Sequence, residues 1–134
     1  MKRASIAICV ILCWFLKAEV LSQTFEIRVD EELGGLHVMR VGSENPVVTQ
    51  NAKRGMRPYL HPIKTPDGKG VLTEMHPSHH LHQTGVYWGL KKVNGRDFFM
   101  NHGVEFYRFK SLRGVEKTGE EVSWETVYDL IDES

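Results

Sequence analysis

The sequence predicts an all-β protein built from antiparallel strands. After position 22, several short segments alternate apolar with polar side chains, and Phe25–Val29 is the clearest of them. Alternation with a period of two is the pattern of a strand with one buried face. The chain also has 12 glycines and 5 prolines, which supply turn signals at short spacing. No helical periodicity of useful length follows residue 22, so we expect an antiparallel β architecture.

The strands follow from these alternating segments and from the turns between them. Pro66-Asp67-Gly68 is a turn signal, because proline presets φ and glycine tolerates a positive φ. Asn94-Gly95 is the preferred pair for a type I′ hairpin turn, in which both central residues have a positive φ. The expected strands are Phe25–Val29, Leu36–Val41, Tyr59–Ile63, Val86–Leu90, Asp97–Met100, Val104–Phe109 and Glu121–Ile131. Gly42–Arg57 is expected to be a loop with one short strand at Val47–Val48.

The first 22 residues have the pattern of an export signal. Lys2 and Arg3 precede an apolar run from Ala4 to Leu16 that only Ser5 interrupts. This run is shorter than the roughly 18 apolar residues of a membrane-spanning helix and is typical of a secretory signal. We therefore expect a signal peptide at 1–22, a β domain at 23–134, and a location in the periplasm or outside the cell. An uncleaved anchoring helix is the alternative.

Export would change both the cysteine content and the charge. Cys9 and Cys13 lie in the apolar run, so the mature chain would have no disulfide. Without residues 1–22, Lys plus Arg falls from 17 to 14 and Asp plus Glu from 17 to 16, so the net charge changes from 0 to −2. The cations are scattered among acids, and nucleic acid is therefore not an expected partner. No apolar stretch near 18 residues remains, so we expect no membrane span after cleavage.

Histidines are concentrated in the middle of the chain and mark the candidate site. Six of the seven fall between positions 61 and 102, namely His61, His76, His79, His80, His82 and His102. Imidazole titrates near neutral pH, and its neutral form is the commonest metal ligand in proteins. On an extended segment, His80 and His82 would point to the same face, where a third ligand could complete a metal site. The available third ligands are His61, Asp97, His102 and Glu105.

Two other interpretations of the histidines stay open. They could form a metal-free polar pocket in which a histidine acts as acid or base. They could instead line a polar loop and bond backbone carbonyls or water. Nearby, Arg57 could pair with a carboxylate or phosphate. Tyr87 and Trp88 could stack on a sugar or pack in the core.

Four motifs in order resemble the PmoA-like family, which carries the label methane oxygenase PmoA. They are Arg57-Pro58-Tyr59-Leu60-His61-Pro62-Ile63, Thr65-Pro66-Asp67-Gly68, His79-His80-Leu81-His82-Gln83-Thr84-Gly85-Val86-Tyr87-Trp88-Gly89 and Val93-Asn94-Gly95-Arg96-Asp97-Phe98-Phe99. The resemblance runs from about residue 25 to the end and covers the N-terminal half of such proteins, so we expect a truncated C-terminus. His80 and His82 match the family's histidines, whereas Gln83 stands where the family pattern has a histidine.

The resemblance implies an exported bacterial protein with a β-sandwich of the sugar-mutarotase kind and carbohydrate as its substrate class. It does not imply methane oxidation, because the mature sequence has no apolar span. We expect His80 and His82 to act as catalytic acid or base. The expected sugar contacts are His61, Arg57, Gln83, Tyr87 and Trp88. The alternatives are a copper, iron or zinc ion held by His80 and His82, and a binding fragment without catalysis.

Overall fold

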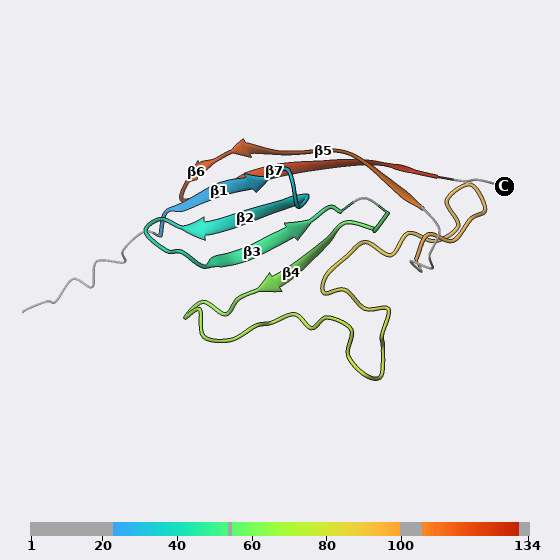
Figure 1. Ribbon diagram of the computed structural model, residues 1–134, viewed down its shortest axis with the longest axis horizontal. Coiled ribbons are helices and arrows are strands. Elements are labelled where there is room, and N and C mark those ends of the chain that lie inside the picture. The colour runs from blue at the N-terminus through green and yellow to red at the C-terminus, as the bar shows by residue number, and fades with distance from the viewer. Residues whose placement is uncertain (1–22, 54, 100–105, 132–134) are drawn as a thin grey trace, which may run out of the picture.

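A computed structural model describes residues 23–53, 55–99 and 106–131 (Figure 1). The expected signal peptide lies outside these residues. Within them the chain is all-β and antiparallel, as expected, and it contains no helix. The strands are β1 (Phe25–Asp30), β2 (Gly35–Arg40), β3 (Pro46–Asn51), β4 (Tyr59–Ile63), β5 (Tyr107–Glu116), β6 (Thr118–Gly119) and β7 (Ser123–Leu130). No helix in this described part is long and apolar enough to cross a membrane.

The strands form two sheets that pack against each other. The larger sheet has the order β4-β3-β2-β1-β6, and the smaller pairs β5 with β7. Figure 1 shows the pair β5–β7 running along the β1 side of the larger sheet. A Cβ atom added at Gly114 of β5 would lie 3.2 Å from Cγ2 of Ile27 in β1. Glycine at this position therefore lets the two sheets approach closely.

Strand register decides which side chains face β7. Leu36 pairs with Gln50, and Val38 pairs with Val48. Directly paired residues point to the same face of a sheet. The indole of Trp124 in β7 donates a hydrogen bond to the Gln50 side chain at 3.4 Å, so this is the face turned toward β7.

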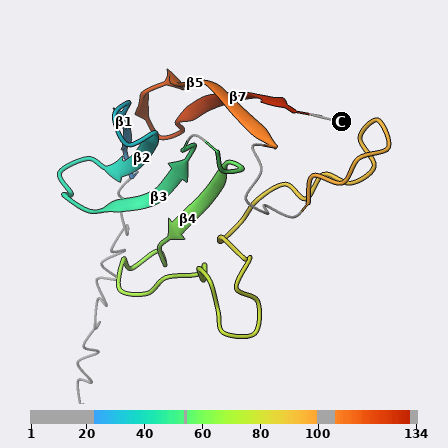
Figure 2. The ribbon, with the colours of Figure 1, turned by 45° about the vertical axis from the view of Figure 1, so that its right-hand side comes forward.

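Residues 64–106 connect β4 to β5, and no strand lies within the described part of this segment. Figure 2 shows the described part of this segment, residues 64–99, extending well beyond the sheets. The strands expected at Val86–Leu90 and Asp97–Met100 are therefore wrong, at least over their described residues. Isolated bridges take their place, such as Leu60 with Val86. Phe98 is only 2% exposed, which shows that its apolar character serves core packing and not a strand ladder.

Four other predicted strands agree closely with the structure. β1, β2, β4 and β7 lie within one or two residues of the predicted ranges. The Asn94-Gly95 turn is also confirmed, because the two residues have φ of 51° and 87° and Arg96 N donates to Val93 O. β3 is longer than the expected Val47–Val48, β5 extends well past Phe109, and β6 was not expected.

An aromatic cluster of Phe98, Tyr107 and Tyr128 forms a compact part of the core. The ring centroids of Phe98 and Tyr107 lie 6.3 Å apart, and those of Tyr107 and Tyr128 lie 5.5 Å apart. The Tyr107 hydroxyl donates to Phe98 O at 2.5 Å. Offset and edge-to-face aromatic pairs at such distances stabilise a core beyond their buried area. This cluster holds the end of the long connecting segment against β5 and β7.

Candidate functional site

The histidine segment 76–83 is folded into tight turns and is not extended. His80 N donates to Pro77 O, and Gln83 N donates to His80 O, both at 2.9 Å. These are two successive four-residue turns, and they replace the extended segment on which we placed His80 and His82. Pro77 is the first residue of the first turn, and its carbonyl accepts the bond that closes the turn.

The turns still gather three imidazoles. Ring centroids lie 4.9 Å apart for His79 and His80, and 5.7 Å apart for His80 and His82, each in an edge-to-face arrangement. The row continues to Phe99, 6.5 Å from the His82 ring. His79 and His80 are exposed, whereas His82 is half-buried. Solvent therefore reaches the outer end of the row.

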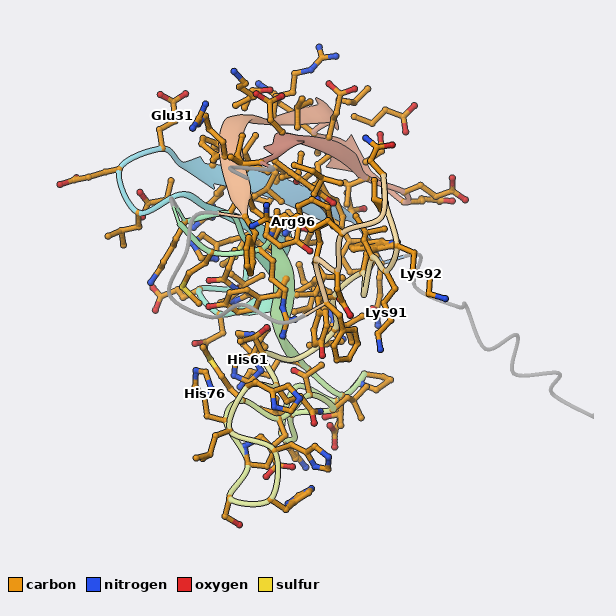
Figure 3. The ribbon with its side chains drawn as sticks, turned by 90° about the vertical axis from the view of Figure 1, so that its right-hand side faces the viewer. Glu31, His61, His76, Lys91, Lys92 and Arg96 are labelled. Atoms are coloured by element: carbon orange, nitrogen blue, oxygen red, sulfur yellow. The ribbon has the colours of Figure 1, made fainter. Side chains whose placement is uncertain are left out.

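His61 and His76 have local hydrogen bonds. His76 Nδ1 donates to Leu81 O at 2.5 Å, which fixes its tautomer with Nε2 as the acceptor. His61 Nδ1 lies 2.9 Å from the Thr73 hydroxyl oxygen, which also accepts from Ile63 N. In the view of Figure 3, His61 and His76 lie toward the end of the molecule remote from Glu31. The His76 bond to a main-chain carbonyl is of the kind expected for histidines that line a polar loop, whereas His61 bonds a side-chain hydroxyl.

The described residues offer no ready metal centre. Among residues 23–53, 55–99 and 106–131, no group of three or more His, Cys, Asp or Glu side chains is placed to hold a metal ion. His102 and Glu105, two of the expected third ligands, lie outside these residues. The metal hypothesis for His80 and His82 thus stays a prediction.

Arg57 is the buried anchor of this region. The side chain is 1% exposed. Its Nη2 donates to His82 O at 2.8 Å, and its Nη1 donates to Phe99 O. The guanidinium carbon lies 3.3 Å from the centroid of the Tyr87 ring, a close cation–π contact. Arg57 therefore joins two parts of the long connecting segment that are 17 residues apart.

The surroundings of Arg57 disfavour the charged form of its guanidinium. Burial lowers the pKa of the guanidinium below its usual value, and the nearby Tyr87 and Tyr107 partly offset this effect. Its Nε atom has no hydrogen-bond partner among the described residues. Arg57 was expected at the edge of a pocket, and in the structure main-chain carbonyls and the Tyr87 ring occupy its guanidinium.

A groove of about 550 Å³ lies between β3, β7 and the connecting segment. Of the seven predicted site residues, Trp88 lines this groove and the other six do not. Trp88 is 62% exposed, so its indole stands largely in solvent at the groove wall. The other aromatic and polar lining residues are Trp124, Tyr128, Gln50, Ser123 and Thr126.

Gln50 fixes the orientation of Trp124. The Gln50 amide nitrogen donates to Asn51 O at 3.0 Å and to Tyr59 O at 3.3 Å. Its oxygen then faces the indole N–H of Trp124. Gln50 is only 3% exposed, and a buried amide with bonds on both sides has one stable orientation. Trp124 is thereby a fixed wall of the groove.

Comparison with protein families identifies the chain at the level of a family. A model described as "Family of unknown function (DUF6807)" matches residues 28–131. The chain belongs to the DUF6807 family. The matched range contains both the histidine segment and the groove. This description names neither PmoA nor methane oxidation, so the resemblance to the PmoA-like family stays a prediction. Comparisons with curated proteins and with solved structures gave no match.

Most of the groove of this DUF6807 chain was not predicted from the sequence. Trp124, Thr126 and Tyr128 lie at alternate positions of β7, so all three point to one face. The strand itself was predicted, and its two aromatic residues could have marked that face as a candidate surface. Gln50 gave no such signal, because the segment around it was expected to be a loop.

Proposed function

We propose that the chain is a carbohydrate-binding protein whose ligand lies in the groove beside Trp88, Trp124 and Tyr128. The observation that carries this proposal is the composition of the groove wall. Aromatic faces stand beside an amide and hydroxyl groups, and none of the lining residues in the described part of the chain is charged. The volume of about 550 Å³ lies in the range of about 300 to 1,000 Å³ that small-ligand sites occupy.

This wall fits the chemistry of a neutral sugar. A pyranose ring has an apolar C–H face and a rim of hydroxyl groups. Indole and phenol rings pack against apolar faces and keep a polar edge for hydrogen bonding. Ser123 can donate to or accept from a sugar hydroxyl, and Gln50 holds the indole of Trp124 in place beside the ligand. An uncharged wall favours neutral sugars, because a buried charge on the ligand would have no partner.

The histidine segment is a second candidate site. The close approach of the His80 and His82 rings supports acid–base catalysis or a shared metal ion. Elemental analysis of protein purified without a histidine tag tests the metal. About one equivalent of copper, iron or zinc after dialysis is expected for a metal site, and a substoichiometric amount would argue against it.

The proposal includes export and the finer fold. Two packed antiparallel sheets support a β-sandwich of the sugar-mutarotase kind, and the apolar run at Ala4–Leu16 supports a secretory signal. N-terminal sequencing of the secreted product tests the expected cleavage after Ser22.

Calorimetric titration with a panel of neutral oligosaccharides tests the binding function. Replacing Trp88 by alanine should weaken binding at least tenfold, because the side chain loses its aromatic face. Trp124→Phe should weaken it less, since a ring remains without the indole N–H. Leu81→Ala is the matched control, because Leu81 is 69% exposed but lies on the histidine segment.

The His80→Ala variant separates the two candidate sites. If the groove is the sugar site, His80→Ala should bind the sugar as tightly as the unmodified chain does. If no sugar in the panel binds, carbohydrate binding is rejected. If His80→Ala abolishes binding and Trp88→Ala does not, the ligand lies at the histidine segment and the groove is the wrong site.

A further inference from the structure

A second groove continues the first along the same face of the larger sheet. Its volume is about 640 Å³. Val122 lines both grooves. On the opposite wall, Gln50 lines the first and Val48 lines the second. These two residues are two positions apart on β3, so they share a face and lie about 7 Å apart along the strand.

Apolar residues outnumber polar ones in the lining of the second groove, and its charged lining residues are Arg40, Lys64, Glu120 and Glu121. Arg40 lies in its wall, where Nε donates to the Gln23 side chain at 3.2 Å and Nη2 donates to Pro66 O. These bonds hold the guanidinium in place. Leu72, also in the wall, is 67% exposed. The grooves thus each have a large exposed apolar side chain, Trp88 in the first and Leu72 in the second.

We infer that the two grooves together bind one extended oligosaccharide chain. This inference rests on the proposed carbohydrate-binding function and adds the length of the ligand to it. A single sugar unit needs only the first groove, with its aromatic walls. The shared residue Val122 and the shared face of β3 make the second groove the direct continuation of that site. Its apolar lining residues suit the C–H faces of further units, and its polar and charged lining residues suit their hydroxyl groups.

Chain length is therefore the variable to test. Full-length protein is titrated by calorimetry with neutral gluco-oligosaccharides, and with xylo- and manno-oligosaccharides, each from one to six units. Affinity should rise at least tenfold from the disaccharide to the longest chain in the series that binds. Such a rise is expected because units in the second groove add contacts without a second cost of association.

Two neighbouring residues give a matched pair of variants. Leu72→Ala should lower the affinity for the longest chain at least fivefold and leave the disaccharide unchanged. Val71→Ala should change neither, because Val71 is 47% exposed but lines neither groove. Both positions are exposed, so both variants should fold, and their thermal midpoints check this.

The results distinguish the extended site from the carbohydrate-binding function on which it rests. Equal affinity for all lengths, or a Leu72→Ala variant that binds the longest chain normally, overturns the extended site and leaves sugar binding in the first groove intact. Absence of binding at every length overturns both.

Discussion

At the scale of single residues, Arg57 is a charged side chain whose contacts are structural. A guanidinium has five N–H donors in a fixed plane. Here the donors reach carbonyls at His82 and Phe99, and one face of the plane covers the Tyr87 ring. Tyr87 precedes Trp88 of the groove in sequence. Arg57 therefore contacts both the histidine segment, at His82 O, and the residue next to Trp88 of the groove wall.

We predict that Arg57→Met destabilises the fold by about 2–3 kcal/mol, because two half-buried carbonyls lose their donor. Arg28→Met is the control. Arg28 is exposed and pairs with Glu26 at the surface, where an ion pair contributes about 0–1 kcal/mol. Urea unfolding followed by circular dichroism measures both. Equal losses for the two variants would show that the buried contacts of Arg57 add nothing.

The burial of Arg57 could not be predicted from its own sequence neighbourhood. Its partners lie 25 and 42 positions away, and a single sequence carries no direct record of contacts at such distances. The same holds for Gln50 and Trp124, which are 74 positions apart. The predicted catalytic residues His80 and His82 are close in the chain, so their proximity in space follows from local turns.

At the scale of elements, strands with clear alternation were predictable and the long connection was not. In β7, half-buried residues alternate with exposed ones from Trp124 to Leu130, so a period of two is visible in its sequence. The described part of the connection between β4 and β5 also contains apolar side chains, but those that are buried, such as Phe98, pack individually and not as part of a strand. A local pattern does not distinguish this packing from a strand. Turn chemistry was the exception, since Asn94-Gly95 was correctly predicted.

Gly85 is the tightest point of this packing, and we predict that Gly85→Ala costs about 3 kcal/mol or more. Its φ is 76°, and an added Cβ would lie 2.3 Å from Leu60 O and 2.9 Å from the His61 Cβ. Gly42→Ala is the control, because Gly42 has a similar φ of 81° but nothing within 4 Å of the added atom. Backbone strain alone should cost about 1–2 kcal/mol there.

Chemical denaturation of both glycine variants gives the comparison. The difference between them measures the steric contact of the connecting segment with β4, because the backbone strain is common to both. Similar losses in the two variants would contradict the close approach at Gly85.

At the scale of the whole molecule, tyrosines join the two sheets to the connecting segment. Burial raises the pKa of Tyr59, Tyr107 and Tyr128 above the usual value of 10.0, and Tyr128 raises that of Tyr107 further. The folded state thus favours the neutral phenols. The stability they contribute is complete below pH 10.0 and is lost as the pH rises further, because the unfolded chain ionises first.

We therefore predict a fall in the free energy of unfolding as the pH rises above about 10, measured by urea titration at each pH. Lysines also titrate in this range, so Tyr128→Phe is the control that isolates the phenols. This variant should lose stability less steeply with pH than the unmodified chain. An identical slope would show that Tyr128 is not protected from ionisation by the fold.

The ion pairs on the outer surface of the β5–β7 pair have a consequence for association between copies. Lys110 pairs with Asp129 and Arg113 with Glu125, so the cations belong to β5 and the acids to β7. Two copies that joined antiparallel through β7 would bring acid beside acid, and through β5 cation beside cation. Association of two copies through their β7 strands, or through their β5 strands, is therefore unfavourable at low salt. It becomes easier at high salt, because salt screens the repulsion between like charges.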